Sequence, residues 1–329
     1  MPNKLATLEA KSLHVSVIVP CFNNGNFLHQ CVASLNNGVH PNEIIIIDDS
    51  STDNSVAIAK ELASHYDNIK LIERNKNGGA AAARYDGFKV AKNEWIAIVD
   101  ADDYIEDDAL LSAYNKVKAH GADMCIWNLW RFDTEKQWPQ ITFNETDFPK
   151  TGRQSVLATL GRWQIHPLGI AQKKLYLEAY KSFPNENIHL MNADELITRL
   201  VFSKAKKVTF TEERYFYRVN LSSTTLKKSP KQLSTIHSDI WLLSFIKEYN
   251  EISSGTIAKG TIGKLFQFHL DRNHYGHEAV QTEIKYALIK IKELAPPWKW
   301  LWRHPKHLIA YIYISLIYRK AIWNTKPSE

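Results

Sequence analysis

The chain has 329 residues, of which 44% are hydrophobic and 23% charged. This composition is that of a globular protein with enough apolar material for one large domain or two smaller ones. The formal net charge is +6, and the basic runs lie in the C-terminal part, which indicates an anionic partner or a membrane surface there. The three cysteines, Cys21, Cys31 and Cys125, form no CxxC motif or paired framework, which favours a reducing compartment.

Neither end of the chain reads as a targeting or spanning segment. Residues 1–20 lack the basic, apolar and small-residue order of a secretory signal. No stretch reaches the roughly 18 apolar residues that a spanning helix needs. We therefore expect a cytoplasmic protein without a transmembrane helix.

Strand and helix signals alternate along the first 100 residues. Short apolar runs predict strands at 14–20, 43–49, 69–74 and 94–100. Helical spacing and capping side chains predict helices at 26–37, 50–66 and 78–91. Because these strands are apolar on both faces and alternate with helices, the pattern predicts a mainly parallel sheet covered on both sides.

A polar cluster follows each of the four predicted strands. In such sheets, ligands bind beyond the carboxyl ends of the strands. We therefore expect four loops to converge on one crevice. Their sequences are CFNN, DDSSTD, RNKNGG and DADD.

The pattern is less regular after about residue 120. It predicts a strand at 123–132, helices at 154–163 and 192–205, a short element at 173–180, and a strand or hairpin at 207–219. From about residue 228 onward it predicts helices, at 230–250, 260–273 and 278–294.

Three aspartates, Asp100, Asp102 and Asp103, lie within four residues at the end of the fourth predicted strand. Like charges this close repel, and each carboxylate is costly to desolvate. Something positive is therefore expected beside them: a bound cation, a basic side chain, or else solvent over a helix N-terminus. The acids at 106–108 fit the last explanation, because a helix dipole favours negative charge at its start.

The four stretches VSVIVPCFN, EIIIIDDSSTDNS, NGGAAAARYDG and DADD, in this order and spacing, resemble the nucleotide-sugar-dependent glycosyltransferases of family 2. The resemblance covers roughly residues 13–225. It implies an α/β fold, the Rossmann-like GT-A fold, with helices around a mainly parallel sheet and a helical C-terminal extension. We expect a catalytic domain at 1–226, with a nucleotide-binding half at 13–120 and an acceptor half at 121–226, followed by a helical region at 227–329.

The resemblance also implies an activity. An inverting, metal-dependent enzyme would move a sugar from a UDP-sugar donor to a glycan or lipid-linked glycan, in bacterial polysaccharide, capsule or lipopolysaccharide synthesis. Breaking the sugar–phosphate bond leaves negative charge on the β-phosphate, which a divalent cation stabilises. Hard cations bind carboxylate and phosphate oxygens together. By resemblance, Asp102 holds Mn²⁺ or Mg²⁺, with Asp103 as an alternative ligand.

Further residues of the nucleotide site follow from the same resemblance. Tyr85 stands where the family usually has Asn, which leaves the local hydrogen bonding open. Two of these residues have an alternative interpretation: Phe22 could be a core residue, and Arg218 could form a structural ion pair. The expected roles are backbone geometry for Pro20, base stacking for Phe22, a bond to the uracil imide for Asp49, and ribose contact for Asp100, with Ala101 beside it. Arg84 is expected to approach either the nucleotide or the acidic residues that follow the fourth strand, and Arg218 is expected to bind the diphosphate.

An inverting transfer needs a base that takes the proton of the acceptor hydroxyl. In the family this base belongs to an acidic pair, often Glu-Asp, that opens a helix. The matching pair here is Asp194-Glu195, in the reverse order. Either carboxylate fits, and we favour Asp194. A helix cap is the other interpretation of Asp194, and the two roles are compatible.

The C-terminal tail, 296–329, combines aromatic, aliphatic and basic residues as segments at a bilayer interface do. We expect peripheral attachment to the inner face of the cytoplasmic membrane; a packed helix or a dimer interface is the alternative. The oligomeric state stays open, and no nucleic-acid partner is expected. Four histidines are candidate zinc ligands, but the three at 269, 274 and 277 have a spacing that fits one helix face poorly, and no cysteine lies with them, so no zinc site is expected. The four are His166, His269, His274 and His277.

Two rival functions remain. A nucleotidyltransferase acting on sugar phosphates would need a basic, glycine-rich phosphate loop after the first strand, but PCFNNGNF has no basic residue. A catalytically silent sugar-nucleotide-binding module is the other rival. The presence of Asp100, Asp102 and Asp194 argues against it.

Overall fold

A computed structural model describes residues 13–160, 163–183, 188–219, 229–247, 251–295 and 301–322. Parts of the expected aromatic tail, 296–300 and 323–329, lie outside these residues. Contacts divide the chain into two compact units. The first comprises Met1–Val156, Gln164–His189 and Ile197–Asn220, and the second comprises Leu157–Trp163, Leu190–Leu196 and Leu221–Glu329.

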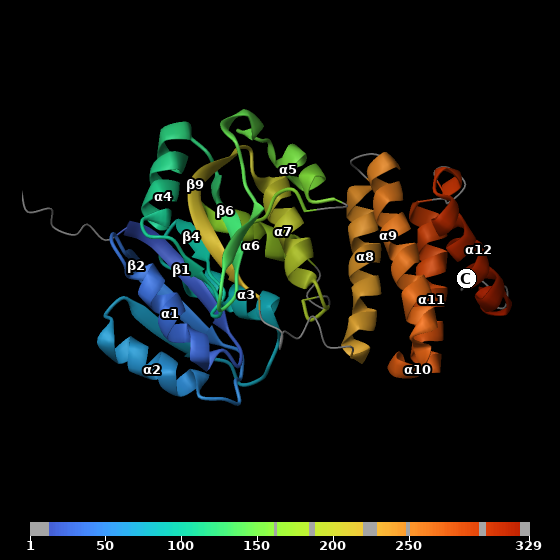
Figure 1. Ribbon diagram of the computed structural model, residues 1–329, viewed down its shortest axis with the longest axis horizontal. Coiled ribbons are helices and arrows are strands. Elements are labelled where there is room, and N and C mark those ends of the chain that lie inside the picture. Colours follow the sequence, from blue (N-terminus) through green and yellow to red (C-terminus); the bar gives the residue numbers. More distant parts are fainter. Residues whose placement is uncertain are drawn as a thin grey trace, which may run out of the picture. The chain divides into compact units, whose positions relative to one another are not determined.

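A parallel half-sheet forms the start of the first unit, as the apolar runs predicted (Figure 1). Its strands run in the order β3-β2-β1-β4, and all three pairs of neighbours are parallel. The strands are β1 (Leu13–Cys21), β2 (Pro41–Asp48), β3 (Ile69–Glu73) and β4 (Trp95–Ile98). The helices between them are α1 (Gly25–Leu35), α2 (Ser55–His65) and α3 (Ala80–Val90).

Both faces of this half-sheet are buried. Val17 and Ile46 belong to a core that includes residues of α1 and α2. The alternate residue Ile18 faces the other way, toward α3, where a Cβ on Gly87 would lie 2.6 Å from the Ile18 Cγ2 atom. The absence of a side chain at Gly87 therefore lets α3 pack directly on the sheet.

The second half of the sheet is mixed. β8 (Gly169–Gln172) pairs antiparallel with β4 and with β6 (Met124–Phe132), and no sequence signal predicted it. A Cβ on Gly169 would lie 2.0 Å from the Cys125 carbonyl oxygen, so the two backbones leave no room for a side chain. β9 (Val208–Arg218) is one strand rather than a hairpin, and it pairs with β6 in parallel. The remaining strands are β5 (Tyr104–Ile105), antiparallel to β9, and β7 (Gln137–Ile141), antiparallel to β6.

The other helices of this region are α4 (Ala109–His120), α5 (Gly152–Ala158) and α6 (Lys173–Ser182), with a short 3-10 helix η1 (Glu145–Asp147). Helix α7 (Ala193–Lys204) follows, and its first turn is counted with the second unit. The mixed α/β architecture and the helical C-terminal extension agree with the expected fold class.

The second unit is helical. Its elements are η3 (Pro230–Ser234), α8 (Thr235–Ile246), α9 (Glu251–Leu270), α10 (Arg272–Tyr275), α11 (His277–Leu294), η5 (Leu301–Arg303) and α12 (Pro305–Ile322). Apolar side chains that include Leu243, Ile262 and Ile284 are fully buried. Among the described residues, no helix combines the length and the apolar character needed to span a membrane.

Candidate active site

The three aspartates Asp100, Asp102 and Asp103, here called the acidic centre, follow β4 where it lies beside β1. The pairing of these strands continues into the loop, because Ala101 N–H donates to the Pro20 carbonyl at 3.4 Å. The strand order reverses direction between β1 and β4. Ligands of open α/β sheets bind at such a switch point.

Asp100 has a basic partner. The Nη2 atom of Arg84, on α3, lies 2.7 and 3.1 Å from the two carboxylate oxygens of Asp100. The backbone of Asp100 is held as well: its N–H donates to the Tyr215 hydroxyl at 3.1 Å, and its carbonyl accepts the Cys31 thiol at 3.6 Å. The positive charge of the Arg84 guanidinium thus relieves part of the repulsion expected among the three aspartates.

Asp103 is enclosed in the protein and is only 2% exposed. One carboxylate oxygen accepts the Tyr215 hydroxyl at 2.7 Å, and the other accepts the Arg218 N–H at 2.8 Å. Burial, followed by the charges of Asp102 and Asp100, raises the pKa of Asp103 well above its ordinary value. Asp103 therefore supports the loop, whereas Asp102 is only partly buried.

Arg218 lies at the end of β9, beside the acidic centre. Its Nε donates to the Asp102 carbonyl at 2.7 Å, and its guanidinium carbon lies 4.3 Å from the ring centres of both Phe27 and Phe132. A further hydrogen bond goes to Gln30 on α1. Burial lowers the pKa of Arg218 despite the nearby Asp102 and Asp103. These contacts hold the positively charged guanidinium of Arg218 next to Asp102.

Tyr215→Phe is expected to destabilise the fold by about 1 to 3 kcal/mol, because a buried oxygen of Asp103 would lose its hydroxyl donor. The free energy of unfolding in urea measures the effect. Tyr217→Phe is the matched control, since Tyr217 lies on the same strand and is 39% exposed. Equal stability losses in the two variants would contradict a supporting role for the Tyr215 hydroxyl.

Asp49, directly after β2, holds the loop that follows β3. Its carboxylate accepts the backbone N–H groups of Gly78 and Gly79 at 2.9 and 2.7 Å, and it forms an ion pair with Arg74. Gly79 has a φ of +84°, a conformation that favours glycine. Asp49 is 2% exposed. The predicted bond from a uracil imide to Asp49 stays a prediction, and each of its oxygens already accepts protein N–H groups.

Phe22 is not a core residue. It follows β1 and is 38% exposed, so its ring is accessible to a ligand. On α3, Tyr85 stacks on Tyr180 of α6, with ring centres 4.7 Å apart and planes within 4°. Aromatic packing between two helices thus takes the place of the hydrogen bonding expected of an Asn at this position.

Asp194 and Glu195 lie in the first turn of α7 and are partly buried. The helix begins at Ala193, so Asp194 lies inside the helix rather than at the capping position before it. The preceding turn is fixed within the second unit, because the Met191 carbonyl accepts the Ser238 hydroxyl at 2.6 Å. The role of base stays a prediction for either carboxylate.

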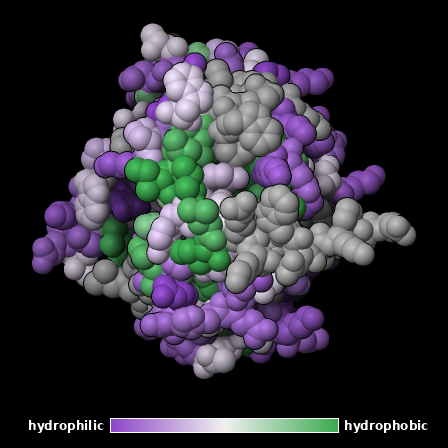
Figure 2. Space-filling view, turned by 90° about the vertical axis from the view of Figure 1, so that its right-hand side faces the viewer, coloured by the Kyte–Doolittle hydropathy of each residue, from purple (hydrophilic) through white to green (hydrophobic). Residues whose placement is uncertain are grey.

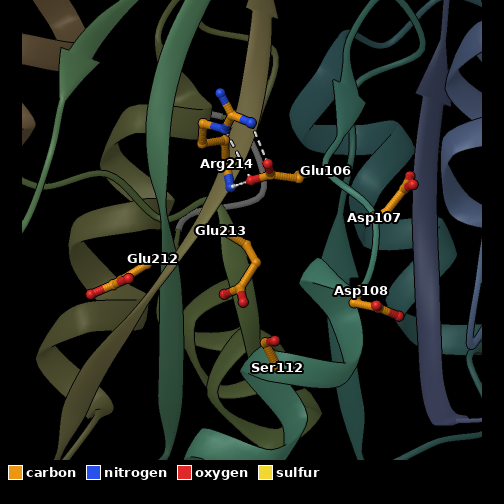
Figure 3. Close-up of a pocket in the computed structure, with 7 residues that line it drawn as sticks. All are labelled: Glu106, Asp107, Asp108, Ser112, Glu212, Glu213 and Arg214. Carbon is orange, nitrogen blue, oxygen red and sulfur yellow. Dashed lines mark hydrogen bonds and ion pairs between the residues drawn. The ribbon is translucent and has the colours of Figure 1, made fainter.

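A separate depression contains none of the predicted site residues (Figure 3). Its volume is about 540 Å³, and its lining comprises Glu106, Asp107, Asp108, Ser112, Glu212, Glu213 and Arg214. The sequence predicted that the acids at 106–108 open a helix. That interpretation holds only for Asp108, which precedes α4, since Glu106 pairs with Arg214 and Asp107 accepts the side-chain amide of Asn37 at 2.6 Å.

Within the described parts of the chain, no group of three or more His, Cys, Asp or Glu side chains is arranged to hold a metal ion. The histidines have other surroundings. His166 is buried, which lowers its pKa to about 3, and its Nδ1 accepts the Leu168 N–H at 3.2 Å. The Nδ1 of His269 lies 2.9 Å from the Tyr318 hydroxyl.

Residues 16–171 match the model of the family described as Glycosyl transferase family 2. Residues 16–171 therefore form a glycosyltransferase family 2 domain. The matched range contains most of the parallel half-sheet, the acidic centre, Asp49, and helix α3 with Arg84. The family that the motifs resembled is thereby confirmed.

Relatives of this chain include a poly(ribitol-phosphate) beta-glucosyltransferase of Bacillus spizizenii, 33% identical over 62% of this chain and 32% of that protein. Glycosyltransferase GlyG of Streptococcus pneumoniae is 28% identical over 62% of this chain and 70% of GlyG. The chain thus spans about a third of the Bacillus protein.

Among solved structures, residues 1–349 of S. aureus TarS, in complex with UDP-GlcNAc, match with a TM-score of 0.67 and 19% identity. The match covers 94% of this chain and 92% of that one. The expected GT-A fold is confirmed by this similarity.

Two supporting residues of the site were not predicted. Arg74 pairs with Asp49, and the Tyr215 hydroxyl joins the Asp100 backbone to the Asp103 carboxylate. Tyr215 lies in the segment that resembles the family, but its contact depends on how β9 pairs in the sheet. Local sequence does not encode that pairing.

Proposed function

We propose that the protein is an inverting, metal-dependent glycosyltransferase that moves a sugar from a UDP-sugar donor to a glycan or lipid-linked glycan. The observation that carries this proposal is the acidic centre at the switch point of a family 2 domain, with a guanidinium group on either side. Carboxylates and cations together suit a diphosphate that binds with a metal ion.

The residues present fit a divalent cation. Three carboxyl groups stand beside two guanidinium groups, and their side-chain oxygens are hard ligands. Mg²⁺ and Mn²⁺ need only one or two protein carboxylates when phosphates complete the coordination. Asp102 is the proposed ligand, because both oxygens of Asp103 already accept protein donors. When bound, the ion would stabilise the negative charge on the departing phosphate.

The donor nucleotide would bind along the ends of β1, β2 and β4. The exposed ring of Phe22 suits stacking on the base. Asp49 would accept the imide N–H in addition to the backbone N–H groups of Gly78 and Gly79 that it already accepts. Asp100 would contact the ribose, with the backbones of Pro20 and Ala101 shaping the floor of the site. Arg218 would bind the diphosphate, because its guanidinium is already held beside Asp102. Arg84 would orient Asp100 through their ion pair.

Transfer with inversion requires that the acceptor hydroxyl lose its proton as it attacks the anomeric carbon. Asp194 would accept that proton, with Glu195 as the alternative base. The proton moves to the carboxylate, the new glycosidic bond forms on the face opposite the leaving group, and UDP departs. Both carboxylates open α7, as the acidic pair of the family opens a helix.

The acceptor belongs, in this proposal, to bacterial polysaccharide synthesis, since relatives include an enzyme named for poly(ribitol-phosphate). A lipid-linked acceptor would place the protein at the inner face of the cytoplasmic membrane. The basic and aromatic C-terminal tail supports that location.

Thermal unfolding with nucleotides tests the proposal. UDP with Mn²⁺ is expected to raise the melting temperature more than UDP alone or than ADP or GDP with Mn²⁺. A ligand at 100 times its dissociation constant stabilises the folded state by about 2.7 kcal/mol. Release of UDP from a panel of UDP-sugars then measures turnover. Stabilisation by nucleoside triphosphates and sugar phosphates instead would favour a nucleotidyltransferase and contradict the proposal.

A further inference from the structure

Helix α12 exposes a continuous apolar surface, here called the outer face of α12. It comprises Ile309, Ile312, Tyr313, Leu316 and Ile317, which are 46% to 68% exposed. Figure 2 shows hydrophobic side chains gathered in a band on the side where α12 lies. Single exposed hydrophobic residues are common, but a contiguous set marks an interaction surface.

The spacing of these residues is that of one helix face, since they are three or four positions apart. The opposite face of α12 is already covered: Ile314 is fully buried and Tyr318 is 8% exposed. Within the outer face, the Tyr313 ring also contacts Phe266 and His269 of α9. Its four aliphatic residues are 46% to 68% exposed and add little to the core of the second unit. It runs along the helix rather than sitting at one end, so a partner would contact the helix lengthwise.

Cations gather near the start of α12. Trp302 is 62% exposed, and the Arg303 guanidinium carbon lies 4.7 Å from a ring centre of Trp302. Burial and then the charges of Lys259, His304 and Lys306 lower the pKa of His307, which places these groups near one another. The sequence between Glu293 and Glu329 contains six Lys or Arg residues and no Asp or Glu. An apolar strip in a segment whose charged residues are all basic is complementary to anionic lipid.

We propose that the outer face of α12 lies in the interface of an anionic lipid bilayer, with the helix axis parallel to the membrane surface. The aliphatic side chains would enter the acyl boundary, while Trp302, Arg303 and Lys306 would lie among the headgroups. This inference rests on the proposed function, whose lipid-linked acceptor it would bring to the enzyme, and it identifies the lipid class and the surface that binds it.

Charge favours a lipid over a second copy of the chain. A symmetric pair of outer faces would bring two sets of cations together, and the 294–328 segment has no acid to oppose them. Anionic headgroups supply that opposing charge, at about 1 kcal/mol for each Lys or Arg near the surface, which is roughly a fivefold gain in binding.

Sedimentation of the full chain with vesicles tests the inference. We expect binding to phosphatidylcholine vesicles that contain phosphatidylglycerol, and much weaker binding to pure phosphatidylcholine. Ile312→Ser with Leu316→Ser should lower the partition coefficient by about tenfold or more, because two large apolar side chains leave the bilayer. Val90→Ser is the matched control, since Val90 is 38% exposed but lies on α3, in the first unit.

A variant with fewer positive charges separates the electrostatic contribution to vesicle binding from the apolar contribution. Arg303→Gln with Lys306→Gln should weaken binding to phosphatidylglycerol vesicles by roughly 25-fold, on the fivefold gain per charge above, and leave the weak binding to phosphatidylcholine unchanged. Melting temperatures check that each variant is folded. If the Ile312 and Leu316 variant melts early, Ile309→Ser with Ile317→Ser replaces it.

Vesicle binding that survives both apolar variants would overturn the inference. The outer face would instead contact a second copy of the chain if the protein did not bind vesicles and if light scattering showed a dimer that becomes a monomer in the apolar variant. UDP–Mn²⁺ stabilisation and transfer to a soluble acceptor are measured on the same proteins. They should be unchanged when only lipid docking fails, whereas vesicle binding without UDP binding would contradict the proposed function alone.

Discussion

Asp102→Asn is expected to lower metal-dependent transfer by about a thousandfold or more, equivalent to at least about 4 kcal/mol of transition-state stabilisation. The amide keeps the shape of the side chain but removes the charge that would hold the cation. Asp102 is partly buried, and Asp103 carries the structural contacts of the loop, so the fold should remain. Turnover of the UDP-sugar as a function of Mn²⁺ concentration measures the change.

Two further variants give this result its meaning. Asp107→Asn is the matched control, because Asp107 is exposed and belongs to the separate acidic depression, so activity should be retained. Asp103→Asn should chiefly reduce stability, since its carboxylate accepts two buried donors. Full Mn²⁺-dependent turnover in Asp102→Asn would remove the metal role from this residue.

Asp194→Ala is expected to bind UDP normally and yet to lose transfer by about a hundredfold to ten-thousandfold, the range typical for loss of a general base. The substitution removes the proton acceptor but leaves the acidic centre intact. Thermal stabilisation by UDP with Mn²⁺ measures donor binding, and kcat at saturating acceptor measures the chemical step.

Glu195→Gln is the comparison, because the two carboxylates are adjacent in the first turn of α7. If Asp194 is the base, this variant should retain most of its kcat. A normal rate in Asp194→Ala together with a large loss in Glu195→Gln would transfer the role to Glu195. Loss of UDP binding in Asp194→Ala would instead indicate a contribution to the donor site.

The parallel half of the sheet was predictable because its information is local. The run predicted at 14–20 became Leu13–Cys21, and the run at 69–74 became Ile69–Glu73. Strands buried on both faces are continuous apolar stretches, and the polar residues after them reveal where each strand ends. The position of Asp100, Asp102 and Asp103 at the end of β4 followed from the same pattern.

The remaining features depend on contacts between distant segments. β8 has only four residues, and its place between β4 and β6 comes from pairing that no short stretch encodes. Helix α9 begins at Glu251 instead of 260, although its extra turns contain a glycine, because packing overrides intrinsic propensity. The burial of Asp103 beneath Tyr215 likewise arises from residues more than 100 positions apart.

The hold of Asp49 on Gly78 and Gly79 has a thermodynamic consequence. The loop after β3 is ordered by a carboxylate of its own chain, so its conformational entropy is lost when the protein folds and not when the donor arrives. A nucleotide that binds against this loop therefore contacts a surface that is already ordered. Its affinity then depends mainly on the contacts it makes, because little freedom remains there to be frozen.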